Sequence, residues 1–186
     1  MVVHGSISTI NPDEPRAVAI GLFDGLHLGH CAVICRMLAA GETRGLIPTV
    51  FTFDIWNGSK PDLKTAEGRL LAPGAFEARL RDMGVHTLVR LPFDTVRHLS
   101  PEQFAREVLI NALCTKAIFC GENFRFGKNA AAGATELCAL GETLGFSTEA
   151  LALVEHEGEP ISSTRIRLCI KLGNTATASA MLGERV

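Results

Sequence analysis

A chain of 186 residues with 47% hydrophobic and 20% charged side chains has the size and composition of one globular domain, and it is too apolar to be disordered. Its formal net charge of −2 excludes a global positive field that would attract nucleic acid or an anionic membrane. The N-terminus lacks a secretory signal, and no apolar run approaches the ~20 residues of a membrane span. We therefore expect a cytoplasmic protein with no nucleic-acid or membrane partner.

Six cysteines are scattered along the chain without a Cys-x-x-Cys pair, which predicts reduced thiols rather than a disulfide framework. Cys31 and Cys35 share a helical face, but a tetrahedral zinc site needs a second pair of ligands. We therefore expect no metal site built from protein ligands.

Apolar, β-branched runs alternate with helical patterns along the whole chain. In chain order they predict a strand at 17–23, a helix at 29–40 closed by Gly41, a strand at 46–53, a helix at 74–84, a strand at 86–91, a helix starting at the capping box Ser100–Gln103, a strand at 117–120, a helix at 135–144, a strand at 148–154 and a helix at 163–171. This alternation predicts an α/β fold, a parallel sheet with helices on both faces.

Three irregular segments, 21–30, 54–62 and 121–133, follow predicted strands. In a parallel sheet, ligands bind beyond the carboxyl ends of the strands. We therefore expect these segments to contribute to one binding site.

The segment "GLFDGLHLGH" places His27 and His30 where a strand gives way to a helix. If the helix starts near His27, both imidazoles lie on one face of its first turn, beside unpaired N–H groups that attract anions. Gly29 leaves no side chain in the way of the anion. The two histidines are therefore candidate donors to phosphoryl oxygens, and the alternative is a histidine-capped helix with nothing bound.

The segment "PISSTRIRL" at 160–168 combines hydroxyls with Arg165 and Arg167. Hydroxyls and N–H groups at a helix start can hold phosphate, and guanidinium groups donate well to it. Simple helix capping with surface arginines remains the alternative.

The segment "CGENFRFGKNAAAG" at 120–133 is not a P-loop, because five residues separate Gly121 from Gly127 and Asn129 replaces the Ser or Thr. Its two phenylalanines, amide and basic group favour a surface for a flat aromatic ligand that bears a phosphate. The alternative is that Phe124 and Phe126 only anchor the loop to the core.

Taken together, the motifs "GLFDGLHLGH", "FTFD", "LPFD", "LSPEQF", "GENFRFGK" and "ISSTRIR", followed by "GNTATASAMLGERV", resemble the adenylyltransferase module of prokaryotic-type FAD synthetases. The resemblance runs from about residue 16 to the C-terminus. It implies a Rossmann-like nucleotidylyltransferase fold and the reaction FMN + ATP → FAD + pyrophosphate. Mg²⁺ is expected to bind mainly through the phosphates of ATP.

The resemblance also implies residue roles. His27 and His30 would be catalytic. The implied ATP-binding residues are Gly21, Phe23, Asp24, Gly29, Ser162, Ser163, Thr164 and Arg167, and the implied flavin-binding residues are Phe53, Asp54, Trp56, Asn123, Phe124 and Phe126.

The chain departs from the family pattern at two places near the flavin. After "TFD" the family usually has proline and a His-Pro pair, whereas this chain has Ile55 to Gly58, and a lysine common near the start of the 74–84 helix is Phe76. Two alternatives stay open: a nucleotidylyltransferase with another acceptor, such as a pantetheine or glycerol phosphate, and a flavin-binding module without catalysis.

The domain expectation is a single FMN adenylyltransferase domain over residues 1–186, without the riboflavin kinase domain of the bifunctional enzymes. We expect FMN and ATP as small-molecule partners, and a monomer or weak homo-oligomer.

Overall fold

A computed structural model describes residues 1–54 and 68–183. Within these residues one parallel sheet has six strands in the order β1–β4–β3–β2–β5–β8. The strands are β1 (Val2–His4), β2 (Arg16–Ile20), β3 (Ile47–Asp54), β4 (Thr87–Pro92), β5 (Thr115–Gly121) and β8 (Ser147–Leu151). The predicted parallel α/β architecture is thereby confirmed.

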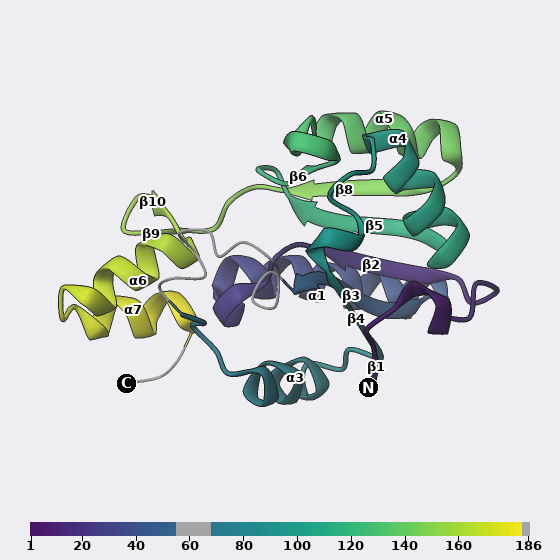
Figure 1. Cartoon of the computed structure of the whole chain (residues 1–186). Coiled ribbons are helices and arrows are strands. Elements are labelled where there is room, and N and C mark those ends of the chain that lie inside the picture. The colour runs from purple at the N-terminus through teal and green to yellow at the C-terminus, as the bar shows by residue number, and fades with distance from the viewer. Residues whose placement is uncertain (55–67, 184–186) are drawn as a thin grey trace.

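Helices cover both faces of the sheet (Figure 1). The helices on the two faces are α1 (Leu28–Arg44), α3 (Pro73–Asp82), the short α4 (Pro101–Gln103), which continues as a π-helix over Phe104–Ala112, and α5 (Ala134–Leu144). Two further helices, α6 (Ser163–Lys171) and α7 (Thr175–Leu182), follow them in the chain. Within the described residues, no helix is long and apolar enough to cross a membrane.

The core has two layers because successive strand residues point to opposite faces. Ala17 and Ala19 of β2 pack with α1 and α3, whereas Val18 and Ile20 pack with the π-helix and α5. All five residues of β2 are buried, as expected for a strand in the middle of a parallel sheet.

The order of the strands fixes where a ligand can bind. From β2 the chain moves to β3 and β4 on one side, and then crosses back to β5 on the other side of β2. The crevice beyond the carboxyl ends of β2 and β5 is therefore a topological switch point, the usual ligand site of open α/β sheets.

The C-terminal helices α6 and α7 lie beyond this end of the sheet, on the left of Figure 1. They pack around a small cluster of their own that includes Ile166, Ala178 and Met181. The chain reaches them through the antiparallel hairpin β9 (Glu155–His156) and β10 (Glu159–Pro160). A second small ribbon, β6 (Arg125–Phe126) and β7 (Ala132–Gly133), follows β5.

The structure corrects two predicted boundaries. The strand predicted at 17–23 ends at Ile20, because the chain turns at Phe23 with a φ of 47°. Helix α1 does not stop at Gly41 but continues to Arg44, and Gly45, with a φ of 62°, caps it. Gly41 instead gives close packing, since a Cβ there would lie 3.1 Å from the Leu46 carbonyl oxygen.

Candidate active site

The turn after β2 has an unusual backbone. Phe23, Gly25 and Leu26 all have positive φ angles, of 47°, 83° and 46°. A left-handed conformation at a non-glycine residue is unfavourable and persists only where its surroundings hold it. Here both non-glycine side chains are fully buried, and a Cβ on Gly21 would lie 3.2 Å from the Phe23 ring. The turn is thus held by packing beneath it.

The structure brings the two predicted catalytic histidines together. His27 is the N-cap of α1, and its Nδ1 accepts a hydrogen bond from the backbone N–H of His30 at 3.4 Å. The two imidazole rings stack with their centroids 3.6 Å apart. Because Nδ1 is an acceptor, a neutral His27 ring carries its proton on Nε2, which makes Nε2 a hydrogen-bond donor.

Both histidines have a lowered pKa, which favours their neutral forms at pH 7. Burial lowers the pKa of His27 from 6.5 to about 4, although the nearby Asp24 carboxylate opposes this shift. Burial and the neighbouring His27 also lower the pKa of His30 well below its usual value. Among the described residues, Nδ1 of His30 is buried without a hydrogen-bond partner. Buried polar atoms are normally hydrogen-bonded, so this nitrogen is a candidate to bond to a ligand in the site.

Phe23 and Gly29, two residues predicted to bind ATP, lie next to the histidine rings. The Phe23 ring is buried and meets the His30 ring edge-on at 5.3 Å, so it supports that histidine from below. Gly29 leaves the space above His27 open, because a Cβ there would lie 3.3 Å from the His27 ring.

Helix α6 meets the same turn from the opposite side. Ser163 Oγ donates to the Asp24 carbonyl oxygen at 2.9 Å, and Arg167 Nη2 donates to the Asp24 carboxylate. Ser162 is the N-cap of α6 and Thr164 is exposed on its first turn. The predicted Ser-Ser-Thr-x-x-Arg group therefore lies against the turn that precedes the histidines.

Arg165 is part of a different structure from Arg167. Its Nη1 donates to the carbonyl oxygens of His156 and Glu159, at 2.9 Å and 2.8 Å. It therefore holds the β9–β10 hairpin, as expected for a residue two positions away on the helix.

The predicted flavin residues are divided between surface and core. Phe126 is only 5% exposed and packs against Phe104, with the ring centroids 5.8 Å apart. The half-buried Phe124 stacks on Phe126, and Asn123 is exposed. Phe53, on β3, packs edge-on against Phe51 and Phe93. Phe126 thus anchors the loop to the core, whereas Asn123 and Phe124 are accessible.

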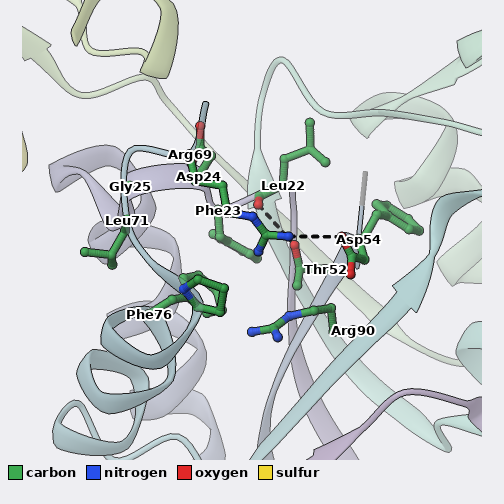
Figure 2. A pocket seen from close by; sticks show the side chains of 12 residues that line it. Leu22, Phe23, Asp24, Gly25, Thr52, Asp54, Arg69, Leu71, Phe76 and Arg90 are labelled. Carbon is green, nitrogen blue, oxygen red and sulfur yellow. Dashed lines mark hydrogen bonds and ion pairs between the residues drawn. The ribbon is translucent and has the colours of Figure 1, made fainter. Parts of the chain in front are cut away.

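A hollow opens beside the turn, at the ends of β3 and β4. Figure 2 shows the Arg69 guanidinium reaching across it toward Asp54, which it pairs with at 3.5 Å. Arg90 of β4 lies over the Phe76 ring, with Cζ 5.4 Å from the centroid, and pairs with Glu77 at 3.0 Å.

Arg69 and Arg90 were missed by the sequence argument. A single arginine within the apolar run "HTLVRL" was the available signal for Arg90. Trp56 and the rest of the segment at 55–62 lie outside the described residues. Within the described ranges, no cluster of His, Cys, Asp and Glu residues could hold a metal ion.

Most of the residues that form this site lie within a known protein family's sequence pattern. A family model described as FAD synthetase matches residues 9–165, which include the turn, both histidines and the start of α6. This chain belongs to the FAD synthetase family. The resemblance inferred from the motifs is thus confirmed over most of the chain.

Two curated proteins are similar to this chain over nearly its whole length. A bifunctional riboflavin kinase/FMN adenylyltransferase of Pseudomonas fluorescens is 29% identical, over 96% of this chain and 58% of its own length. FAD synthetase 1, chloroplastic, of Arabidopsis thaliana is 27% identical, over 96% of this chain and 54% of its own. The chain therefore spans little more than half the length of these relatives.

A crystal structure described as a macrolide-efflux protein from Streptococcus pneumoniae matches 98% of this chain and 60% of its own, with a TM-score of 0.84 and 28% identity. The fold of this FAD synthetase family member is thus also that of a solved protein.

Proposed function

We propose that this protein is an FMN adenylyltransferase, which transfers AMP from ATP to FMN and releases pyrophosphate. The observation that carries the proposal is the pair of stacked, neutral imidazoles at the start of α1, placed at the switch point of the sheet. Membership of the FAD synthetase family supports the choice of flavin as the acceptor.

The histidines act on the α-phosphate. His27 Nε2–H and the His30 ring donate hydrogen bonds to its non-bridging oxygens, where negative charge builds up as the new bond forms. Gly29 and the N-terminal N–H groups of α1 allow the anion to approach the backbone. Donors held in place before the reaction stabilise this charge without having to reorganise.

The bond changes need no nucleophilic side chain. A phosphate oxygen of FMN attacks the α-phosphorus, and the bond from the α-phosphorus to the bridging oxygen breaks. Pyrophosphate leaves with that oxygen and its charge. Arg167, Ser163 and Thr164 would receive the β- and γ-phosphates, and positioning with electrostatic stabilisation accounts for catalysis.

The isoalloxazine would lie against the loop after β5. Asn123 and Phe124 are accessible there, and Phe53 and Asp54 stand at the neighbouring end of β3. Phe126 holds the loop from within the core. Trp56 remains a proposed flavin contact outside the described residues.

Mg²⁺ would enter the site with ATP. The Asp24 carboxylate accepts hydrogen bonds from Arg167 and from the Leu70 N–H, so it is occupied. Bound Mg²⁺ usually keeps several waters and uses substrate phosphates as ligands, which suits a site with few protein oxygens. It would neutralise charge on the polyphosphate.

The reaction uses small molecules only, and we place it in the cytoplasm. We take residues 1–186 as one FMN adenylyltransferase domain, in which α6 and α7 complete the site. A monomer suffices for this, or a weak homo-oligomer.

The test is incubation of the pure protein with ATP, Mg²⁺ and FMN, followed by chromatographic separation of the products. We expect FAD and pyrophosphate in equal amounts, and none from the double variant His27→Ala/His30→Ala. Pantetheine phosphate and glycerol phosphate serve as competing acceptors. Transfer of AMP to either of them but not to FMN would assign a different acceptor, and flavin binding without any transfer would indicate a binding module.

A further inference from the structure

Asp24 is the residue at which the two halves of the site meet. It stands within the strained turn, between Phe23 and Gly25, both of which have positive φ angles. This backbone turns the Asp24 side chain toward α6 and toward the segment that starts at Gly68. The strain therefore serves to place one carboxylate.

Both carboxylate oxygens of Asp24 have partners. Oδ1 accepts from the Leu70 backbone N–H at 3.2 Å, and Oδ2 accepts from Arg167 Nη2. The same Nη2 also donates to the Gly68 carbonyl oxygen at 2.8 Å. The two charged side chains are largely buried, with 16% of Asp24 and 10% of Arg167 exposed.

Direct contact between Asp24 and ATP is unfavourable. A carboxylate beside a polyphosphate repels it, and this carboxylate already accepts hydrogen bonds on both oxygens. Arg167, in contrast, has the planar group that suits phosphate. A long arginine side chain loses rotamer freedom when it binds, and a buried partner that fixes it beforehand lowers this cost.

We propose that Asp24 is a positioning residue that holds the Arg167 guanidinium where it receives the β- and γ-phosphates of ATP. Asp24 acts on the nucleotide through Arg167 and does not contact it. This inference rests on the proposed function for the identity of the ligand, but it can be measured by binding alone.

The experiment is a double-mutant cycle on pyrophosphate binding, read by calorimetry, with Asp24→Asn, Arg167→Gln and the two combined. We expect Asp24→Asn to raise the Kd for pyrophosphate about tenfold, the scale of losing one charge-assisted hydrogen bond. In the Arg167→Gln background the same change should alter the Kd by less than twofold, because its effect passes through Arg167.

Two further variants serve as controls. Asp24→Glu keeps the charge and should recover most of the affinity lost in Asp24→Asn. Arg165→Gln, on the same helix, should leave the Kd for pyrophosphate unchanged, because Arg165 binds the carbonyls of the hairpin. If Asp24→Asn fails to fold, Asp24→Ser, which also removes the carboxylate, takes its place in the cycle with Arg167→Gln.

An equal loss from Asp24→Asn in both backgrounds would overturn the inference, since it would mean that Asp24 acts independently of Arg167. Tighter binding in Asp24→Asn would also overturn it, because Asp24 would then compete with the phosphate. Wild-type protein that makes FAD but shows no coupling would leave the function intact and reject the inference. Coupling without any FAD formation would support the inference about Asp24 and contradict the proposed function.

Discussion

At the residue scale His27 combines an observed task with a proposed one, because it caps α1 and is proposed to donate to the α-phosphate. Its Nδ1 takes the structural hydrogen bond, which leaves Nε2 to donate. Burial lowers the pKa of both rings, and the neighbouring His27 lowers that of His30 further. The capping bond thus selects the tautomer that a phosphate oxygen needs.

Because burial lowers the pKa of His27 to about 4, acid should weaken the fold. Between pH 6.5 and 4 the unfolded chain binds this proton and the folded chain does not, so stability falls as the pH falls. From pH 7 to pH 5 we expect a loss of about 2 kcal/mol from this residue.

Urea unfolding of wild type and His27→Asn at both pH values measures the effect. Asparagine preserves an N-cap but does not titrate, so this variant should lack that part of the pH dependence. The same slope in both proteins would contradict the lowered pKa.

His30 is the second proposed donor, and His30→Ala should lower kcat roughly 10²–10³-fold, the usual cost of removing one preorganised donor. The KM for FMN should change little, since the proposed flavin contacts lie after β5 and at the end of β3, away from His30. Steady-state FAD formation checks both values. Wild-type turnover in this variant would remove His30 from the catalytic role.

At the scale of elements, the loop after β5 carries a buried residue that anchors it to the core, Phe126, and an exposed residue proposed to contact the flavin, Asn123. Phe126→Ala should lower the free energy of unfolding by about 3–5 kcal/mol, because it leaves a cavity against Phe104 in the core. Asn123→Ala should change it by less than about 0.5 kcal/mol, since Asn123 is exposed, while raising the KM for FMN. Denaturant unfolding and kinetics on both variants test the division, and the reverse pattern would exchange the two roles.

The sequence predicts elements well where one local rule decides them. The capping box at Ser100 forms as expected, and the helices at 135–144 and 163–171 differ from the structure by at most one residue. Gly41 shows the limit, because glycine suits both a helix end and a close packing contact. Only the positions of Leu46 and Pro48, each 3.1 Å from a Cβ built on Gly41, distinguish the two.

The π-helix at 104–112 was also beyond prediction. Its backbone hydrogen bonds join residues five positions apart, as from the Leu113 N–H to the Val108 carbonyl oxygen. Two turns are too short for the spacing of apolar residues to distinguish this from an α-helix. Within the described part of the chain, no single contact of Phe104–Ala112 explains why this segment forms a π-helix and not an α-helix.

At the scale of the whole molecule, the sequence predicts the separate segments of the site but not the contacts between them. The histidine pair follows from helix spacing alone, but the Asp24–Arg167 contact joins residues 143 positions apart, which no local pattern specifies. The hollow likewise combines distant segments, because the sheet pairs β3 with β4, which carries Arg90, while Arg69 comes from the stretch that leads into α3.

ATP should stabilise both parts of the molecule, since its proposed ligands come from α1 and α6. At a hundredfold excess over the Kd, amide exchange in Ser163–Lys171 and at the start of α1 should slow by up to about 100-fold. Exchange in β1, at the far edge of the sheet, should not change. Mass spectrometry of exchanged peptides measures this, and protection restricted to α1 would place the β- and γ-phosphates away from α6.

The 143 positions between Asp24 and Arg167 also set a delay during synthesis of the chain. A ribosome that adds about 5–20 residues per second needs roughly 7–29 s to pass from one to the other. During that interval the nascent chain has its paired imidazoles and much of the sheet, but no group to hold pyrophosphate. On the proposed function, we expect a chain that still lacks α6 to be inert toward ATP, and competence to arise only once α6 has been made.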